Sequence, residues 1–321
     1  MVVISKIPAP IVTRQREPVC FFCLTSLDPI PCLFRYNSPM LSLTTLDPVD
    51  YLLIGHLTCD ITPTGLRLGG TATYAALTAQ ALGLRVGIVT SWGAEIPLGP
   101  LRNIPVASFP TEKSTTFENI YTPEGRVQIL HHTAPRLEYF MIPEPWRNTP
   151  IVHLGPVAQE VDPSLVRHFP ASLVGVTPQG FLRGWDDAGH VYLVEWPEAP
   201  FVLEQAGAAV FSVEDVDNNE ARVEEMVAAS RVLVVTEGAR GARVYWNGDV
   251  RRYLPPAKTE VDATGAGDIF AAAFFYRMYA TRDPWEAARF ATLLAANSVT
   301  RVGVEGIPLP AEVEASMVEI I

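Results

Sequence analysis

The chain has 321 residues, of which 48% are hydrophobic and 18% charged, as in an ordinary globular protein. Its formal net charge of −11 argues against a nucleic-acid partner, which would require a basic surface patch. No apolar run reaches the roughly 18 residues of a transmembrane helix, so we expect no membrane partner and a cytoplasmic location.

The N-terminal residues 1–47 differ from the rest of the chain. They are rich in proline and show neither helical nor strand periodicity, so we expect an extension outside the core, followed by one folded domain over residues 48–321. One hypothesis is that Met40 is the natural start, which leaves open whether residues 1–39 belong to the native protein. A signal peptide is the alternative, although no small-x-small cleavage site follows the apolar run 19–24.

Three of the four cysteines, Cys20, Cys23 and Cys32, lie in this extension. A zinc site would need a second pair of ligands at suitable spacing, and none follows. We therefore expect free thiols, as in a reducing cytoplasm.

From residue 49 onward, short apolar runs alternate with helical patterns. The expected strands are 51–55, 85–91, 151–155, 173–177 and 232–236, and the expected helices are 72–82, 218–230, 269–279 and one that begins at Asp283. Buried strands that alternate with helices predict an α/β fold, a three-layer αβα doubly wound sheet that is mostly parallel. Two β-hairpins interrupt the alternation, at 115–132 and at 242–254.

Several residues match positions at helix ends. Thr71 is a candidate N-cap of the first helix, and Gly83 is a candidate stop. In the last helix Asp283 fits the N-cap, Pro284 the first turn, and Glu286 the third position of a capping box.

The most informative segment is V-D-A-T-G-A-G-D-I-F at residues 261–270. Its glycines allow close approach of the backbone, and they open into an apolar helix whose first N–H groups and dipole face a ligand. This arrangement predicts an anion hole for a phosphoryl group, formed by Gly265, Ala266 and Gly267. Asp268 follows in the first helical turn, where a carboxylate can accept the proton of an attacking hydroxyl.

The alternative interpretation is a glycine-rich turn with an aspartate that stabilises the helix start. The chain contains neither a G-x-x-x-x-G-K-[ST] loop nor a dinucleotide fingerprint after its first strand.

Residues 262–270 resemble the C-terminal signature of the PfkB/ribokinase kinases, D-T-x-G-A-G-D-x-F, with Ala263 replacing the first threonine. Further landmarks occur in the family order: Asp60 five residues after Gly55, the pair Gly69–Gly70 before a helix, T-E-G-A-R-G at residues 236–241, and the segment 290–303. The resemblance covers about residues 49–310 and implies a ribokinase-like fold.

The resemblance also implies roles for individual residues. Asp268 would be the general base, beside the anion hole of residues 265–267. The implied substrate-binding residues are Asp60, Gly69, Gly70, Thr71 and Arg183. Asp60 could alternatively be an ordinary loop acid, and Arg183 could pair with Asp186 or Asp187.

The implied cofactors are ATP and Mg²⁺, with K⁺ in some relatives near a position that matches Gly303. The implied nucleotide-binding positions are Thr236, Gly238, Gly241, Thr264 and Thr292. The family's acidic N-x-x-E segment is replaced here, and Asp215 is the residue that could serve magnesium in its stead.

The short connection between Asp60 and Gly69 implies a small lid, formed by the hairpin around 115–132 alone. With Arg183 at a strand end, the chain is similar to the branch that includes plant myo-inositol kinases. The expected function is ATP-dependent phosphorylation of a sugar or other small polyol. A nucleoside or vitamin-precursor kinase and an inactive ligand-binding protein remain alternatives. A monomer and a homodimer both remain open.

Overall fold

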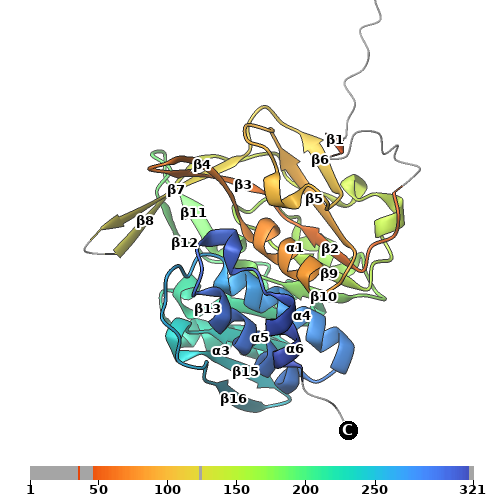
Figure 1. Cartoon of the computed structure of the whole chain (residues 1–321), viewed down its shortest axis with the longest axis vertical. Coiled ribbons are helices and arrows are strands. Elements are labelled where there is room, and N and C mark those ends of the chain that lie inside the picture. The colour runs from red at the N-terminus through yellow and green to blue at the C-terminus, as the bar shows by residue number, and fades with distance from the viewer. Residues whose placement is uncertain (1–34, 37–45, 123–124, 318–321) are drawn as a thin grey trace, which may run out of the picture. The chain divides into compact units, whose positions relative to one another are not determined.

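The computed structural model describes residues 35–36, 46–122 and 125–317 (Figure 1). The cysteines Cys20, Cys23 and Cys32, together with Met40, lie outside the described residues. The end of the expected extension nevertheless contacts the core. Strand β1 (Arg35–Tyr36) pairs antiparallel with a sheet strand, and the Leu46 side chain is buried in the hydrophobic core.

A ten-stranded sheet forms the centre of the domain. Its strands are, in spatial order, β1, β6 (Val106–Pro110), β5 (Val86–Trp92), β2 (Tyr51–Ile54), β9 (Ile151–Leu154), β10 (Leu173–Val176), β13 (Ala208–Ser212), β14 (Val232–Thr236), β15 (Ala242–Trp246) and β16 (Asp249–Tyr253). The strands from β6 to β14 run parallel, and the antiparallel pairs lie at the two edges.

Helices cover both faces of this sheet. They are α1 (Thr71–Ala81), α2 (Ala199–Gln205), α3 (Glu220–Ala229), α4 (Ala266–Thr281), α5 (Pro284–Ser298) and α6 (Pro310–Ser316). Because side chains alternate along a strand, Tyr51 and Leu53 pack toward α1, α4 and α5, whereas Leu52 and Ile54 face the opposite core with α2 and α3. The expected three-layer αβα fold is confirmed (Figure 1).

The first helix begins one residue away from the expected cap. Gly70 is the N-cap, with φ of 84°, and no side chain caps α1. Thr71 is the first helical residue instead, so its hydroxyl is available for other contacts. Gly83 ends the helix with φ of 84°, as predicted.

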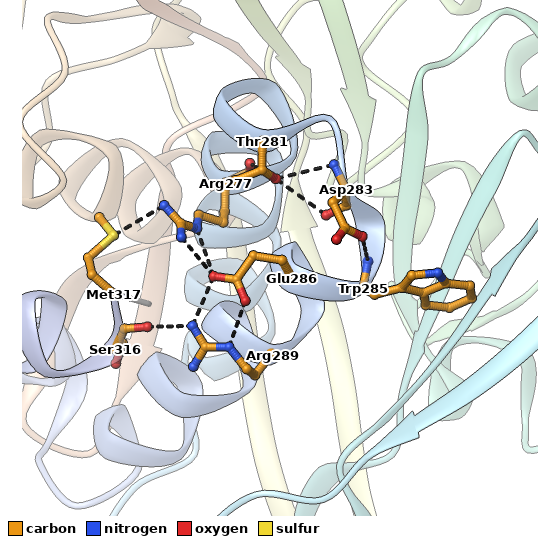
Figure 2. A network of polar contacts seen from close by, with 8 residues as sticks. All are labelled: Arg277, Thr281, Asp283, Trp285, Glu286, Arg289, Ser316 and Met317. Atoms are coloured by element: carbon orange, nitrogen blue, oxygen red, sulfur yellow. Dashed lines mark hydrogen bonds and ion pairs between the residues drawn. The ribbon is translucent and has the colours of Figure 1, made fainter. Parts of the chain in front are cut away.

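The capping box predicted at the start of the helix after Asp283 does not form. Asp283 accepts a hydrogen bond from the Trp285 N–H at 2.9 Å, as an N-cap should, but Glu286 turns away from the helix start. Its carboxylate instead lies between Arg277 and Arg289, with contacts of 2.7–3.0 Å (Figure 2). These charge-assisted contacts tie α5 to α4, the helix that carries Asp268.

The lid is larger than the predicted hairpin. Four strands form it in the order β4 (Gly65–Gly69), β3 (Thr58–Thr62), β7 (Thr115–Thr122) and β8 (Gly125–His132). The connection around Asp60, expected to be a short loop, is thus itself a hairpin, and β3 pairs with β7 in parallel. A further hairpin, β11 (Arg183–Trp185) with β12 (Val191–Leu193), supports the lid through the bridge between Ile129 and His190.

None of the helices in the described part of the chain is long and apolar enough to cross a membrane.

Candidate active site

The N-terminus of α4 presents unpaired backbone donors. Gly265 is its N-cap in the left-handed conformation, with φ of 78°. Within the described residues, the N–H groups of Gly265, Gly267 and Asp268 have no hydrogen-bond partner. The expected donor Ala266 is engaged in the turn, because its N–H donates to the Ala263 carbonyl at 3.1 Å. The donors available to an anion are therefore those of residues 265, 267 and 268.

Asp268 is half-buried beside these donors. Burial raises the pKa of its carboxyl to about 6, and the nearby charge of Asp215 acts in the same direction. A hydrogen bond from the Thr71 side chain and the charge of Arg183 lower this pKa, and so limit the rise. The carboxylate is thus ionised at neutral pH, yet basic enough to accept a proton.

Asp60 lies on β3 and faces the same site. The Thr58 hydroxyl donates to its Oδ1 at 2.8 Å. Its Oδ2 lies against Gly69, where a Cβ atom would collide with the carboxylate, so a side chain at this position would displace Asp60. Burial is the main cause of the raised pKa of Asp60.

Arg183 joins these two carboxylates electrostatically. Its positive charge lowers the pKa of both Asp60 and Asp268. Its Nη1 donates to the Val157 carbonyl at 3.0 Å, and its guanidinium carbon lies 5.5 Å from the centroid of the Phe117 ring. Of the two carboxylates expected as alternative partners of Arg183, that of Asp186 contacts His190 Nδ1 at 3.1 Å.

A neutral network lies beside Thr71. The Tyr51 hydroxyl contacts His153 Nδ1 at 2.8 Å, and His153 Nε2 contacts the Thr177 hydroxyl at 2.9 Å. Burial lowers the pKa of His153 to about 3, so the imidazole is uncharged at neutral pH. The network therefore positions Thr177 without adding charge next to Asp268.

Two hydrogen bonds hold the Asp215 carboxylate near Asp268. Its Oδ1 accepts from the Gln179 amide at 2.8 Å, and its Oδ2 accepts from the Ser212 N–H at 2.9 Å. Among the described residues there is no group of three or more His, Cys, Asp or Glu side chains that could hold a metal by themselves. A divalent cation here would need ligands from a bound phosphate, as Mg²⁺ commonly has.

Three of the expected nucleotide-binding residues lie at one turn. Thr236 ends β14, and Gly238 and Gly241 flank the following turn with φ of 58° and 88°. A Cβ atom on Gly238 would meet nothing within 4 Å, so this glycine borders open space. Glu237 fixes the turn through Arg243 and Arg252, each at 3.0 Å.

The other two expected nucleotide-binding residues, Thr264 and Thr292, lie elsewhere. The Thr264 N–H donates to Asp262 at 2.9 Å, and this carboxylate also accepts from the Gly303 N–H at 2.8 Å. Asp262 thereby ties the glycine-rich segment to the loop after α5. The Thr292 hydroxyl is buried and has no hydrogen-bond partner among the described residues, so its contact with a nucleotide stays a prediction.

The structure thus brings Asp60, Thr71, Arg183, Asp215 and Asp268 together from distant parts of the sequence. Sequence analysis missed Tyr74, whose ring packs against Gly265. The available signal was its spacing, because a residue four positions after Gly70 lies one helical turn from the glycine pair.

Comparison with known proteins finds similarity to kinases. Residues 172–312 match the sequence model of the pfkB family carbohydrate kinases. A cytidine kinase of Thermococcus kodakarensis is 28% identical over 247 residues, which cover 70% of this chain and 87% of that protein. An inositol 3-kinase of Oryza sativa subsp. japonica is 27% identical over 290 residues, covering 81% and 70% respectively.

Solved structures of ribokinase-family proteins share the fold. A pyrophosphate-dependent kinase in the ribokinase family, complexed with a pyrophosphate analogue and myo-inositol, superposes with a TM-score of 0.69 at 18% identity, covering 83% of this chain and 99% of that one. The ribokinase of Arabidopsis thaliana complexed with ribose and ATP gives a TM-score of 0.64 at 18% identity, covering 84% and 98%.

Proposed function

Because residues 172–312 match the pfkB family of carbohydrate kinases, we propose that the protein transfers the γ-phosphoryl group of ATP to a hydroxyl of a sugar or other small polyol. The observation that carries this proposal is the position of Asp268. A carboxylate with its pKa raised to about 6 stands beside the unpaired N–H groups that begin α4, and it shares Arg183 with a second carboxylate, Asp60.

In the proposed reaction, Asp60 and Arg183 orient the acceptor, since vicinal hydroxyls bind well to a carboxylate and a guanidinium. Asp268 accepts the proton of the reacting hydroxyl as its oxygen attacks the γ-phosphorus. The new O–P bond forms while the bond to the β-phosphate oxygen breaks, and ADP leaves. The N–H groups of Gly265, Gly267 and Asp268 stabilise the charge on the transferred group.

We place the nucleotide along the turn that contains Gly238 and Gly241, which borders open space. Magnesium, bound chiefly by the donor phosphates, would neutralise charge on them. Asp215 fits as a protein carboxylate for it, because it lies in the turn after β13 and its charge acts on Asp268. A cytoplasmic location is consistent with ATP as donor and with the free thiol of Cys59.

The relatives favour myo-inositol as the first acceptor to test, and they also keep a second candidate open. The cytidine kinase favours a nucleoside acceptor, for which the four-stranded lid would cover a larger ligand. The pyrophosphate-dependent structures make pyrophosphate an alternative donor. In every case Asp268 keeps the same role.

The test is a panel of acceptors and donors assayed by release of ADP or phosphate. The acceptors are myo-inositol, ribose, fructose, 2-keto-3-deoxygluconate, cytidine, adenosine and hydroxymethylpyrimidine, each with ATP or pyrophosphate and Mg²⁺. Turnover of a polyol with ATP supports the proposal, and turnover of cytidine alone supports the second candidate. If ATP binds but no acceptor turns over, a non-catalytic ligand-binding protein becomes the better account.

A further inference from the structure

Tyr74 lies against the glycine turn that begins α4. A Cβ atom built on Gly265 would come within 2.5 Å of Tyr74 Cγ and Cε1, so the ring occupies the space that a side chain there would need. Tyr74 belongs to α1, and its side chain is only 6% exposed. The absence of a side chain on Gly265 therefore allows the Tyr74 ring to lie directly on the backbone of the anion hole.

The hydroxyl of this tyrosine points along the same turn. Its Oη lies 3.8 Å from the Cβ position of Gly303, whose N–H donates to Asp262. Within the described residues the Tyr74 hydroxyl forms no hydrogen bond with the protein. This hydroxyl is not among the buried polar atoms that lack a partner in the described residues, so it is open to solvent and can donate to a ligand in the site.

Charges around Tyr74 keep it protonated. Burial and the carboxylates of Asp268, Asp60 and Asp262 raise its pKa, whereas Arg67 on the lid strand β4 acts in the opposite direction. The phenol is therefore neutral at any pH at which the protein is folded and active. A neutral donor among three carboxylates can approach a phosphate without adding negative charge.

We propose that the Tyr74 hydroxyl donates a hydrogen bond to the phosphoryl group during transfer and so completes the anion hole formed by the N–H groups of Gly265, Gly267 and Asp268. This inference rests on the proposed kinase activity and adds one catalytic residue to it. The acceptor is the less fitting partner, because the ring lies over Gly265, at the phosphate end of the site, rather than beside Gly69.

The competing explanation is packing alone, in which the ring merely holds Gly265 in its left-handed conformation. Tyr74→Phe separates the two, because phenylalanine keeps the ring and removes only the hydroxyl. Tyr279→Phe is the matched control, since Tyr279 is an exposed residue near the end of α4 and far along the helix from Asp268. Tyr74→Leu, which removes the ring as well, reports the packing contribution.

Steady-state kinetics should show that Tyr74→Phe lowers kcat about 10²- to 10³-fold, the range for loss of one donor to a transition state, with the KM of the acceptor changed less than about twofold. Inhibition by ADP with aluminium fluoride, a mimic of the transferred phosphoryl group, should weaken by a similar factor, while ADP alone binds as before. Tyr279→Phe should match the wild type, and Tyr74→Leu should also lower the melting temperature.

An unchanged kcat in Tyr74→Phe, or an effect confined to the KM of the acceptor, would overturn this inference. Aluminium fluoride inhibition equal to that of the wild type would do the same. These outcomes differ from failure of the proposed function, in which the wild type itself transfers no phosphoryl group from either donor. If Tyr74→Phe has reduced stability, the comparison with the wild type at a temperature at which both are folded still isolates the hydroxyl, and Tyr74→Leu reports the ring.

Discussion

Thr71 and Asp268 are joined by a hydrogen bond from the threonine side chain to the carboxylate, across the interface between α1 and α4. The contact exists because Gly70 takes the N-cap position, which leaves the Thr71 hydroxyl free of a capping role. Two helix starts therefore meet at one point, and the orientation of the proposed base depends on both.

Loss of this hydrogen bond should raise the pKa of Asp268 above its present value of about 6, because the bond stabilises the ionised form. A base must be deprotonated to act, so the acidic limb of kcat/KM should fall near pH 6 in the wild type and shift to higher pH in Thr71→Val. The pH profile measures both. Thr78→Val is the control, since Thr78 bonds only the Tyr74 carbonyl within α1. A flat wild-type profile down to pH 5 would contradict the assignment.

The ionised Asp268 carboxylate should also destabilise the folded state at neutral and alkaline pH. Its folded pKa is raised from 3.8 to about 6, so the folded state holds the proton more tightly than the unfolded state. The cost is absent below pH 3.8, grows as the pH rises toward 6, and is complete above it. Asp268→Asn should therefore melt about 2 °C or more above the wild type at pH 8, and this difference should shrink at pH 5. If Asp268→Asn raised the melting temperature equally at both pH values, the raised pKa of Asp268 would be contradicted.

Arg183 should act on both the acceptor and the base. Arg183→Leu removes the positive charge that lowers the pKa of Asp60 and Asp268, so the acidic limb of kcat/KM should move to higher pH and the KM of the acceptor should rise about tenfold or more. Arg183→Lys keeps the charge but not the planar geometry. It should therefore return the acidic limb of kcat/KM toward its wild-type pH, while the KM of the acceptor stays raised. If both variants shift the profile equally, charge is not the cause.

Gly265 and Gly267 should differ in their tolerance of alanine. Gly265→Ala forces a Cβ into the Tyr74 ring at a φ of 78°, and should destabilise the protein by about 1–3 kcal/mol. Gly267→Ala meets no atom within 4 Å and lies in the first helical turn, where alanine is favourable, so its stability should be unchanged or higher. Urea unfolding at a fixed pH compares them. A stable Gly265→Ala would mean that the turn has another conformation.

Much of the fold could be predicted because buried parallel strands and glycine-bounded helices leave strong local patterns. The hairpin at Asn247–Gly248 and the strand 232–236 are examples in which the sequence alone specifies the element. The lid around Asp60 could not be predicted in this way. The pairing of β3 with β7 is a long-range contact, and a chain of only a few residues between Asp60 and Gly69 reads as a loop when its partner strand is unknown.

The predicted site had the same strengths and gaps. Asp268 and Gly265 could be predicted, because a glycine turn that opens into an apolar helix is typical of an anion-binding site. The contact of Tyr74 with Gly265 depends on how α1 and α4 pack, and the engaged N–H of Ala266 depends on the backbone conformation of the turn before α4. The role of Thr292 depends on the same packing, since a threonine within a helix can face either the site or the core.

The most direct test of the central assignment is transfer of labelled phosphate from [γ-³²P]ATP to an acceptor, compared between the wild type and Asp268→Asn, with ATP affinity measured in parallel. The assignment predicts a labelled, phosphorylated acceptor whose rate of formation falls by about 10² or more in the variant while ATP still binds. A variant that transfers label as fast as the wild type would contradict the role of Asp268, and a wild type that never binds ATP would contradict the proposed donor.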